Sequence, residues 1–91
     1  MYHKFKITPC YAPKGDGRLK GDNFDEFQHA EITKILRTYI EQFKAPIPVG
    51  LQIEPRINRD GDYENYVVWQ VIYGESNGLP VMFVWLTEDE N

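Results

Sequence analysis

The sequence predicts an α+β fold, in which a single helix packs on one face of a four-stranded, mostly antiparallel sheet. Three observations predict it: apolar residues at helical spacing in 23–44, an alternating segment before them in 2–8, and two hairpin turns within 49–87. The expected order along the chain is therefore strand, helix, strand, strand, strand. A length of 91 residues, with 42% apolar and 26% charged side chains, is typical of one small globular domain covering residues 1–91.

The first strand is expected in residues 2–8, where His3, Phe5 and Ile7 alternate with polar neighbours and Pro9 follows as a predicted end. Alternation of this kind is typical of a strand with one buried face.

Residues 10–22 carry three glycines and no apolar period, which predicts a long flexible loop. Three basic side chains in this loop, Lys14, Arg18 and Lys20, form a weakly positive spot where an anion contact is conceivable. The glycines do not have the spacing of a phosphate-binding loop. At the other end of the chain, residues 88–91 are expected to form an acidic, frayed tail.

The helix is expected to begin after Asn23 as N-cap, with Glu26 completing a capping box, and to end near Lys44 because Pro46 and Pro48 prevent continuation. Its apolar face follows the i, i+3, i+4, i+7 rule. That face consists of Gln28, Ile32, Ile35, Leu36, Tyr39, Ile40 and Phe43.

Two turns set the register of the remaining strands. Asn77-Gly78 predicts a two-residue type I′ turn, and residues 58–61 predict a three-residue turn with a bulge, which pairs Ile53 with Val67. A two-residue turn at Asp60-Gly61 would shift this pairing by one residue and turn every side chain over. The bulged turn is preferred because it collects one continuous apolar face.

Counting back from these turns assigns the side chains to two faces. The face expected beneath the helix consists of Val49, Leu51, Ile53, Val67, Trp69, Val71, Tyr73, Met82, Val84 and Leu86. The opposite face carries a second apolar group, made of Tyr66, Val68, Ile72, Val81, Phe83 and Trp85. Nothing in the sequence clearly covers this group, so either the 10–22 loop folds across it or it is a contact surface for another molecule.

Composition excludes several classes of protein. Cys10 is the only cysteine, so an intrachain disulfide is impossible and a reducing cytoplasm, of the cell itself or of a host, is expected. Neither the apolar run of a signal peptide nor the roughly 20 apolar residues of a membrane span are found. The net charge of −4 argues against a partner that is nucleic acid or an anionic membrane.

No catalytic chemistry can be assigned. Nothing in the sequence brings Cys10 close to His3 or His29, so a nucleophile and base are not indicated. The alternating oxygen side chains of residues 58–64 lack the spacing of a calcium loop and fit ordinary turn chemistry. We therefore expect no enzymatic activity, no bound metal and no cofactor.

These observations favour a small protein-interaction module of the inhibitor, antagonist or adaptor type, a class that includes the small antagonists made by phages. It would bind a protein partner or its own copy as a homodimer through the second apolar face, with Tyr66, Phe83 and Trp85 as anchors. The alternative is a module that binds single-stranded nucleic acid, which would stack bases on the same aromatic rings and use the basic 14–20 loop.

Overall fold

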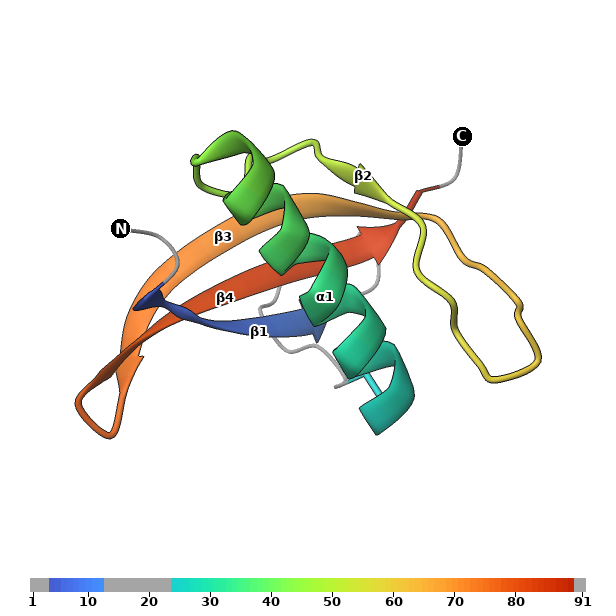
Figure 1. Ribbon diagram of the computed structural model, residues 1–91, viewed down its shortest axis with the longest axis horizontal. Helices are drawn as coiled ribbons and strands as arrows, with labels where there is room; N and C mark the ends of the chain where they lie inside the picture. The colour runs from blue at the N-terminus through green and yellow to red at the C-terminus, as the bar shows by residue number, and fades with distance from the viewer. Residues whose placement is uncertain (1–3, 13–23, 90–91) are drawn as a thin grey trace.

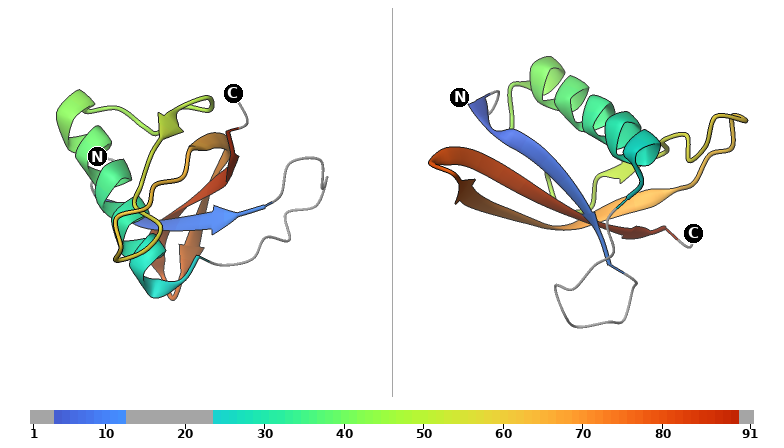
Figure 2. Two further views of the ribbon diagram at one scale, coloured as in Figure 1. Left: turned by 90° about the vertical axis from the view of Figure 1, so that its right-hand side faces the viewer. Right: turned by 90° about the horizontal axis from the view of Figure 1, so that it is seen from below.

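The structure, a computed structural model, describes residues 4–12 and 24–89 and confirms the α+β fold (Figure 1). One helix lies across one face of a four-stranded sheet, and the other face is turned away from it (Figure 2). The elements are β1 (Lys6–Tyr11), α1 (Glu26–Phe43), β2 (Gln52–Ile53), β3 (Tyr66–Ser76) and β4 (Leu79–Glu88). Across the sheet the strands follow the order β1-β4-β3-β2, with β1 parallel to β4 and the other pairs antiparallel.

The first strand lies at an edge of the sheet and is longer than its sequence predicts. Pro9 was expected to end it, yet β1 continues through Pro9 to Tyr11, and the proline side chain is fully buried. An edge strand tolerates proline because the missing N–H can face away from the neighbouring strand. The predicted 10–22 loop therefore starts too early, and residues 13–22 lie outside the described part of the chain.

The β3–β4 hairpin turns where the sequence predicts it. Asn77 and Gly78 have φ angles of 53° and 79°, and positive φ at both positions is what a type I′ turn requires. The predicted register is confirmed from this turn back to Gln70, which pairs with Trp85. Glu88, expected in a frayed tail, instead ends β4, and its Oε1 accepts a hydrogen bond of 3.0 Å from the Tyr11 hydroxyl.

Beyond Gln70 the register changes, and this overturns part of the predicted division into faces. Val68 pairs with Leu86, so Trp69 is the additional residue of a β-bulge. Regular alternation would have placed Trp69 opposite Leu86 and beneath the helix. Instead Tyr66 and Val68 enter the core, with 6% and 1% of their surface exposed, while Trp69 and Val67 lie on the opposite face.

The pairing of β2 with β3 also differs from the prediction by one residue. This shift keeps Ile53 on the helix side although the bulge has turned the facing residues of β3 over. Ile53 pairs with Tyr66 rather than with Val67. The turn is one residue wider than the preferred three-residue turn, because the Asn58 side-chain oxygen accepts from the backbone N–H of Asp60 at 3.0 Å and of Asp62 at 3.2 Å. Ile53 consequently still faces the helix, as the apolar pattern predicts.

The helix begins two residues later than predicted. Asp25 is the N-cap: its Oδ1 accepts from the Gln28 N–H at 2.8 Å, and its own N–H donates to Gln28 Oε1 at 3.2 Å, which forms a capping box. Asn23, the predicted cap, lies outside the described residues. The predicted end is confirmed, since the helix stops at Phe43 and Lys44 caps it with a φ of 53°.

The core lies between α1 and the sheet. Three buried helix residues, Ile32, Leu36 and Ile40, contribute to a cluster that also contains Ile7, Ile47, Ile53, Tyr66, Val68, Met82, Val84 and Leu86. The helix is tied toward β1 by Arg37, whose Nη2 donates to the Phe5 carbonyl at 2.7 Å. The side near β2 is less covered. Phe43 and Val49, both expected in the covered face, are 56% and 66% exposed.

The bulge at Trp69 can be tested with one substitution at two neighbouring sites. Val68→Thr should lower the free energy of unfolding by about 1–3 kcal/mol, because its hydroxyl would be buried beneath α1 without a partner. Val67→Thr, on the opposite and half-buried side, should change it by less than about 0.5 kcal/mol. Urea unfolding followed by circular dichroism measures both. A larger loss at Val67 than at Val68 would show that β3 alternates without a bulge.

Candidate functional site

The side of the sheet turned away from α1, here called the far face, is the first candidate surface. Its side chains come from β1, β3 and β4, and they are Lys6, Thr8, Cys10, Val67, Trp69, Gln70, Ile72, Val81, Phe83, Trp85 and Thr87. Within residues 4–12 and 24–89, no helix or strand packs on this side (Figure 2). Of the six residues predicted to bind a partner, four lie here, although Val81 is only 2% exposed.

Two tryptophans lie side by side on the far face. The ring centroids of Trp69 and Trp85 are 6.2 Å apart with an interplanar angle of 58°. Both side chains are half-buried, as are the paired Ile72 and Phe83. Trp69 was missed from the sequence because a bulge leaves no strong local signal, and the polar Gln70 within an apolar strand is the only irregular position beside it. The far face therefore has a more aromatic centre than predicted.

The far face also contains polar atoms that the described part of the chain leaves unpaired. The indole Nε1 of Trp69, the indole Nε1 of Trp85 and the hydroxyl of Thr87 are buried and have no hydrogen-bond partner among the described residues. A buried donor without an acceptor costs on the order of 1–3 kcal/mol, and buried tryptophan N–H groups usually find a partner. Of the four buried polar side-chain atoms without a partner among the described residues, these three lie on the far face and the fourth, the Thr33 hydroxyl, lies on α1.

The cysteine on the far face is not an activated nucleophile. Cys10 is 9% exposed, its Sγ lies 3.6 Å from the Thr8 carbonyl, and burial raises the pKa of its thiol. A raised pKa keeps the thiol protonated, whereas the thiolate is the reactive form. His29 lies on α1, on the other side of the sheet, so it cannot act on Cys10 as a base.

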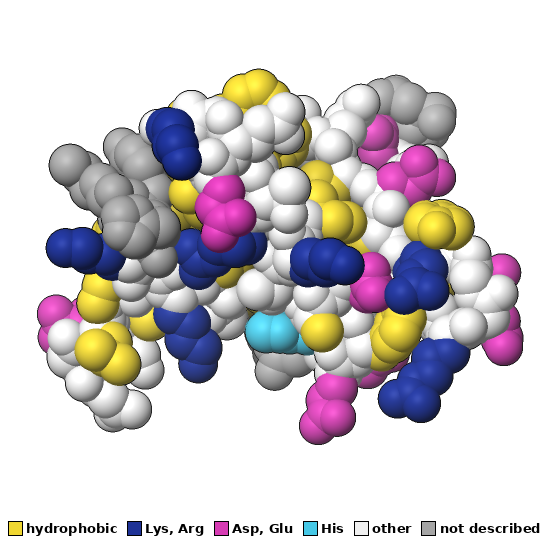
Figure 3. Space-filling view, in the orientation of Figure 1, with side chains coloured by type: hydrophobic (Ala, Val, Ile, Leu, Met, Phe, Trp, Pro, Cys, Tyr) yellow, Lys and Arg dark blue, Asp and Glu magenta, His cyan; other side chains and the backbone are white. Residues whose placement is uncertain are grey.

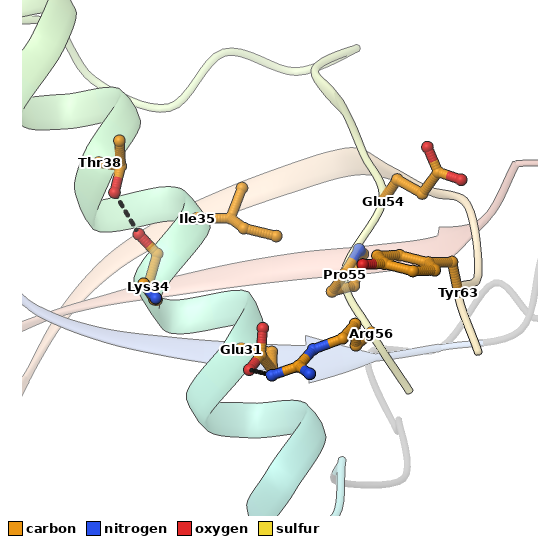
Figure 4. Close-up of a pocket in the computed structure, with 8 residues that line it drawn as sticks. All are labelled: Glu31, Lys34, Ile35, Thr38, Glu54, Pro55, Arg56 and Tyr63. Atoms are coloured by element: carbon orange, nitrogen blue, oxygen red, sulfur yellow. Dashed lines mark hydrogen bonds and ion pairs between the residues drawn. The ribbon is translucent and has the colours of Figure 1, made fainter. Parts of the chain in front are cut away.

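A second candidate surface lies between α1 and the segment 51–59, and we call it the α1–β2 groove. Hollows of about 450, 350 and 320 Å³ follow one another from the N-terminal to the C-terminal end of α1. The middle hollow is lined by Glu31, Lys34, Ile35, Thr38, Glu54, Pro55, Arg56 and Tyr63 (Figure 4). On this side of the molecule, hydrophobic patches alternate with charged side chains of both signs (Figure 3).

An ion pair crosses the groove. Arg56 Nη2 lies 2.9 Å from Glu31 Oε1 (Figure 4). The guanidinium carbon of Arg56 lies 5.4 Å from the centre of the Phe27 ring. The hydrogen bond to Glu31 and the charge of its carboxylate raise the pKa of Arg56. Since both side chains are partly exposed, the pair contributes more to the position of the 54–63 segment against α1 than to stability.

Tyr66, predicted as an anchor for a partner, is part of the core. Its ring meets the rings of Tyr11 and Phe24 edge to face, with centroids 6.2 and 5.4 Å away. Burial, followed by the negative charge of Glu64, raises the pKa of Tyr66 to about 12. Val68 is buried as well, so neither residue is available to a binding partner.

The three basic residues expected to contact an anion, Lys14, Arg18 and Lys20, lie outside the described residues.

Among residues 4–12 and 24–89, no three side chains of His, Cys, Asp or Glu are grouped closely enough to hold a metal ion. The helix α1 is not long and apolar enough to cross a membrane.

Comparisons with protein-family models, with curated proteins and with solved structures found no match to this chain. Function is therefore argued from the geometry of the two surfaces alone.

The burial of Tyr66 has a consequence at high pH. Because the pKa is raised from about 10 to about 12, folding favours the neutral phenol, and this stabilisation is complete below about pH 10 and is lost as the pH rises toward 12. Urea unfolding should therefore show a free energy that falls over this interval. Tyr66→Phe should fall less steeply, because the titrating group is gone. An equally steep fall in both proteins would place the phenol in solvent.

Proposed function

We propose that this protein is a non-enzymatic protein-interaction module that binds a partner, or its own copy, through the far face. The observation that carries the proposal is the Trp69–Trp85 pair, which is half-buried, apolar and equipped with two unpaired indole N–H groups. Tryptophan is strongly enriched among the residues that dominate binding energy at protein interfaces. A partner that covers this face would exclude water from the parts of both rings that are still exposed.

The arrangement of the far face fits this role in a second respect. Phe83 and Ile72 are paired across β4 and β3 next to the tryptophans, so the aromatic centre continues into an aliphatic border. Together these side chains form a rigid surface, since their positions are set by strand backbone. An inhibitor, antagonist or adaptor needs no more than such a surface. The single cysteine, Cys10, supports a reducing cytoplasm as the place of action.

Single-stranded nucleic acid is the second candidate ligand. Three aromatic rings on one strand-built face, those of Trp69, Phe83 and Trp85, have the character of a base-stacking platform. Lys6 is the only basic residue among the far-face side chains described above, and the net charge of the chain is −4. Weak electrostatic attraction to phosphate makes this candidate second to a protein partner.

Fluorescence tests the proposal directly, because both tryptophans of the chain lie on the far face. If copies associate through this face, the emission maximum should shift to shorter wavelength as concentration rises, with the same midpoint as the mass increase in sedimentation equilibrium. If another protein is bound, the shift should occur on its addition. A steeply salt-dependent shift with single-stranded oligonucleotides would instead favour the second candidate.

Trp85→Lys should abolish association while the protein stays folded, because a charge replaces the aromatic anchor. Leu79→Lys is the matched control, since the same lysine is introduced at the first residue of β4, which is 66% exposed. Circular dichroism checks the fold of both variants. Unfolding of Trp85→Lys would mean that the far face is core, and association that survives in folded Trp85→Lys would place the interface elsewhere.

A further inference from the structure

One wall of the α1–β2 groove is an unpaired strand edge. β2 is the outermost strand, and backbone hydrogen bonds tie the chain around it to its inner neighbour. They include Val68 N to Leu51 O at 2.9 Å, Glu64 N to Pro55 O at 3.3 Å and Ile57 N to Asp62 O at 2.8 Å. Residues along an antiparallel strand direct their backbone groups alternately to its two sides. Gln52, Glu54 and Arg56 therefore direct their N–H and C=O groups outward.

These outward groups are free within the part of the chain that the structure describes. The backbones of Glu54 and Arg56 make no hydrogen bond there, and Gln52 and Glu54 are exposed. Donor and acceptor groups recur at every second residue over about 13 Å. Only an extended backbone presents complementary groups at this spacing, which is how strands are added to sheet edges in peptide recognition.

The other edge of the sheet is closed to such an addition. In β1, Pro9 has no N–H to offer, and the Phe5 carbonyl just before the strand already accepts from Arg37 Nη2 at 2.7 Å. Proteins commonly block edges with proline and with cationic side chains, because an open edge pairs with other chains. The two edges of this sheet therefore differ, and the open one borders the groove.

Charge and apolar surface define what would fit along β2. Glu31 is neutralised by Arg56, but Glu54 on the strand side makes no ion pair within the described residues. A basic side chain directly across from Glu54 would complement it. On the helix side, Ile35 lines both the middle and the C-terminal hollow, and Phe43 is 56% exposed. Apolar side chains at alternate positions of an added strand would face this wall.

We propose that the α1–β2 groove binds an extended segment of a partner protein, which adds to the sheet beside β2. The segment has apolar side chains at alternate positions toward α1 and a lysine or arginine across from Glu54. This site is on the opposite side of the sheet from the tryptophans, so its test is independent of the test for the function proposed for the far face.

The probe is an acetylated, amidated heptapeptide with valine at the odd positions, threonine at the second and sixth, and lysine in the centre. Titration up to millimolar concentration, followed by amide shifts and hydrogen exchange, should give saturable changes with protection of the Glu54 and Arg56 N–H groups. Replacing the central lysine by glutamate should weaken binding at least about fivefold. N-methylation of the central lysine should abolish binding, whereas N-methylation of the third-position valine should not, because that N–H faces away from β2.

Substitutions at Glu54 distinguish what its backbone N–H contributes to peptide binding from what its charge contributes. Glu54→Pro removes the outward N–H and should weaken binding at least about tenfold, whereas Glu54→Gln keeps it and should weaken binding about threefold at low salt. Gln52→Pro tests a second outward N–H if the first proline variant does not fold. Trp85→Lys should leave peptide binding unchanged, which distinguishes this site from the far face.

Three outcomes would overturn the proposal. The first is an absence of saturable shifts at millimolar peptide, and the second is binding that leaves the Glu54 and Arg56 amides unprotected. The third is protection of these amides that depends on protein concentration without peptide, which would show that a second copy of the chain occupies the edge.

Discussion

Hydrogen bonding between β3 and β4 decides which side chains reach the space beneath α1. These strands are the central pair of the sheet, and both remaining strands are placed by them: β1 pairs with β4 and β2 pairs with β3. The bulge at Trp69 is the decisive irregularity in this ladder. Without it, Val67 and Trp69 would lie beneath the helix, and Tyr66 with its phenol would lie outside. One additional residue thus sets both the composition of the core and the aromatic content of the far face.

The bulge and the turn at residues 58–61 act together. The bulge places Tyr66 and Val68 on the helix side of the sheet and Val67 on the far face. If Ile53 were paired with Val67, as regular alternation predicts, the Ile53 side chain would also lie on the far face. The Asn58 side chain closes the turn one residue wider, and Ile53 stays under the helix opposite Tyr66. The requirement for one continuous apolar face is therefore satisfied by a different set of residue pairs than regular alternation predicts. This requirement is global, because burial of the face as a whole outweighs any single pair.

The two candidate surfaces follow from the unequal cover that one helix provides. A single helix cannot shield both faces of a four-stranded sheet, so the far face has no helix or strand over it within the described residues. On the covered side, Arg37 holds α1 toward β1, and on the β2 side Arg56 reaches across the groove to Glu31. The first effect leaves an aromatic surface, and the second leaves a groove with a strand edge. Both surfaces arise because a short chain forms too few helices and strands to cover every face and edge of its sheet.

The sequence by itself determined the fold class, the end of the helix and the Asn77-Gly78 turn, because each depends on residues close together in the chain. Positive φ at a two-residue turn is a local requirement, and so is the stop that Pro46 and Pro48 impose. Only the tertiary structure decided that β1 lies beside β4, that Trp69 forms a bulge, that Tyr66 is core and that an edge of the sheet is open beside α1. These features arise from competition among distant segments for one buried face, and local residue patterns do not record the result of that competition.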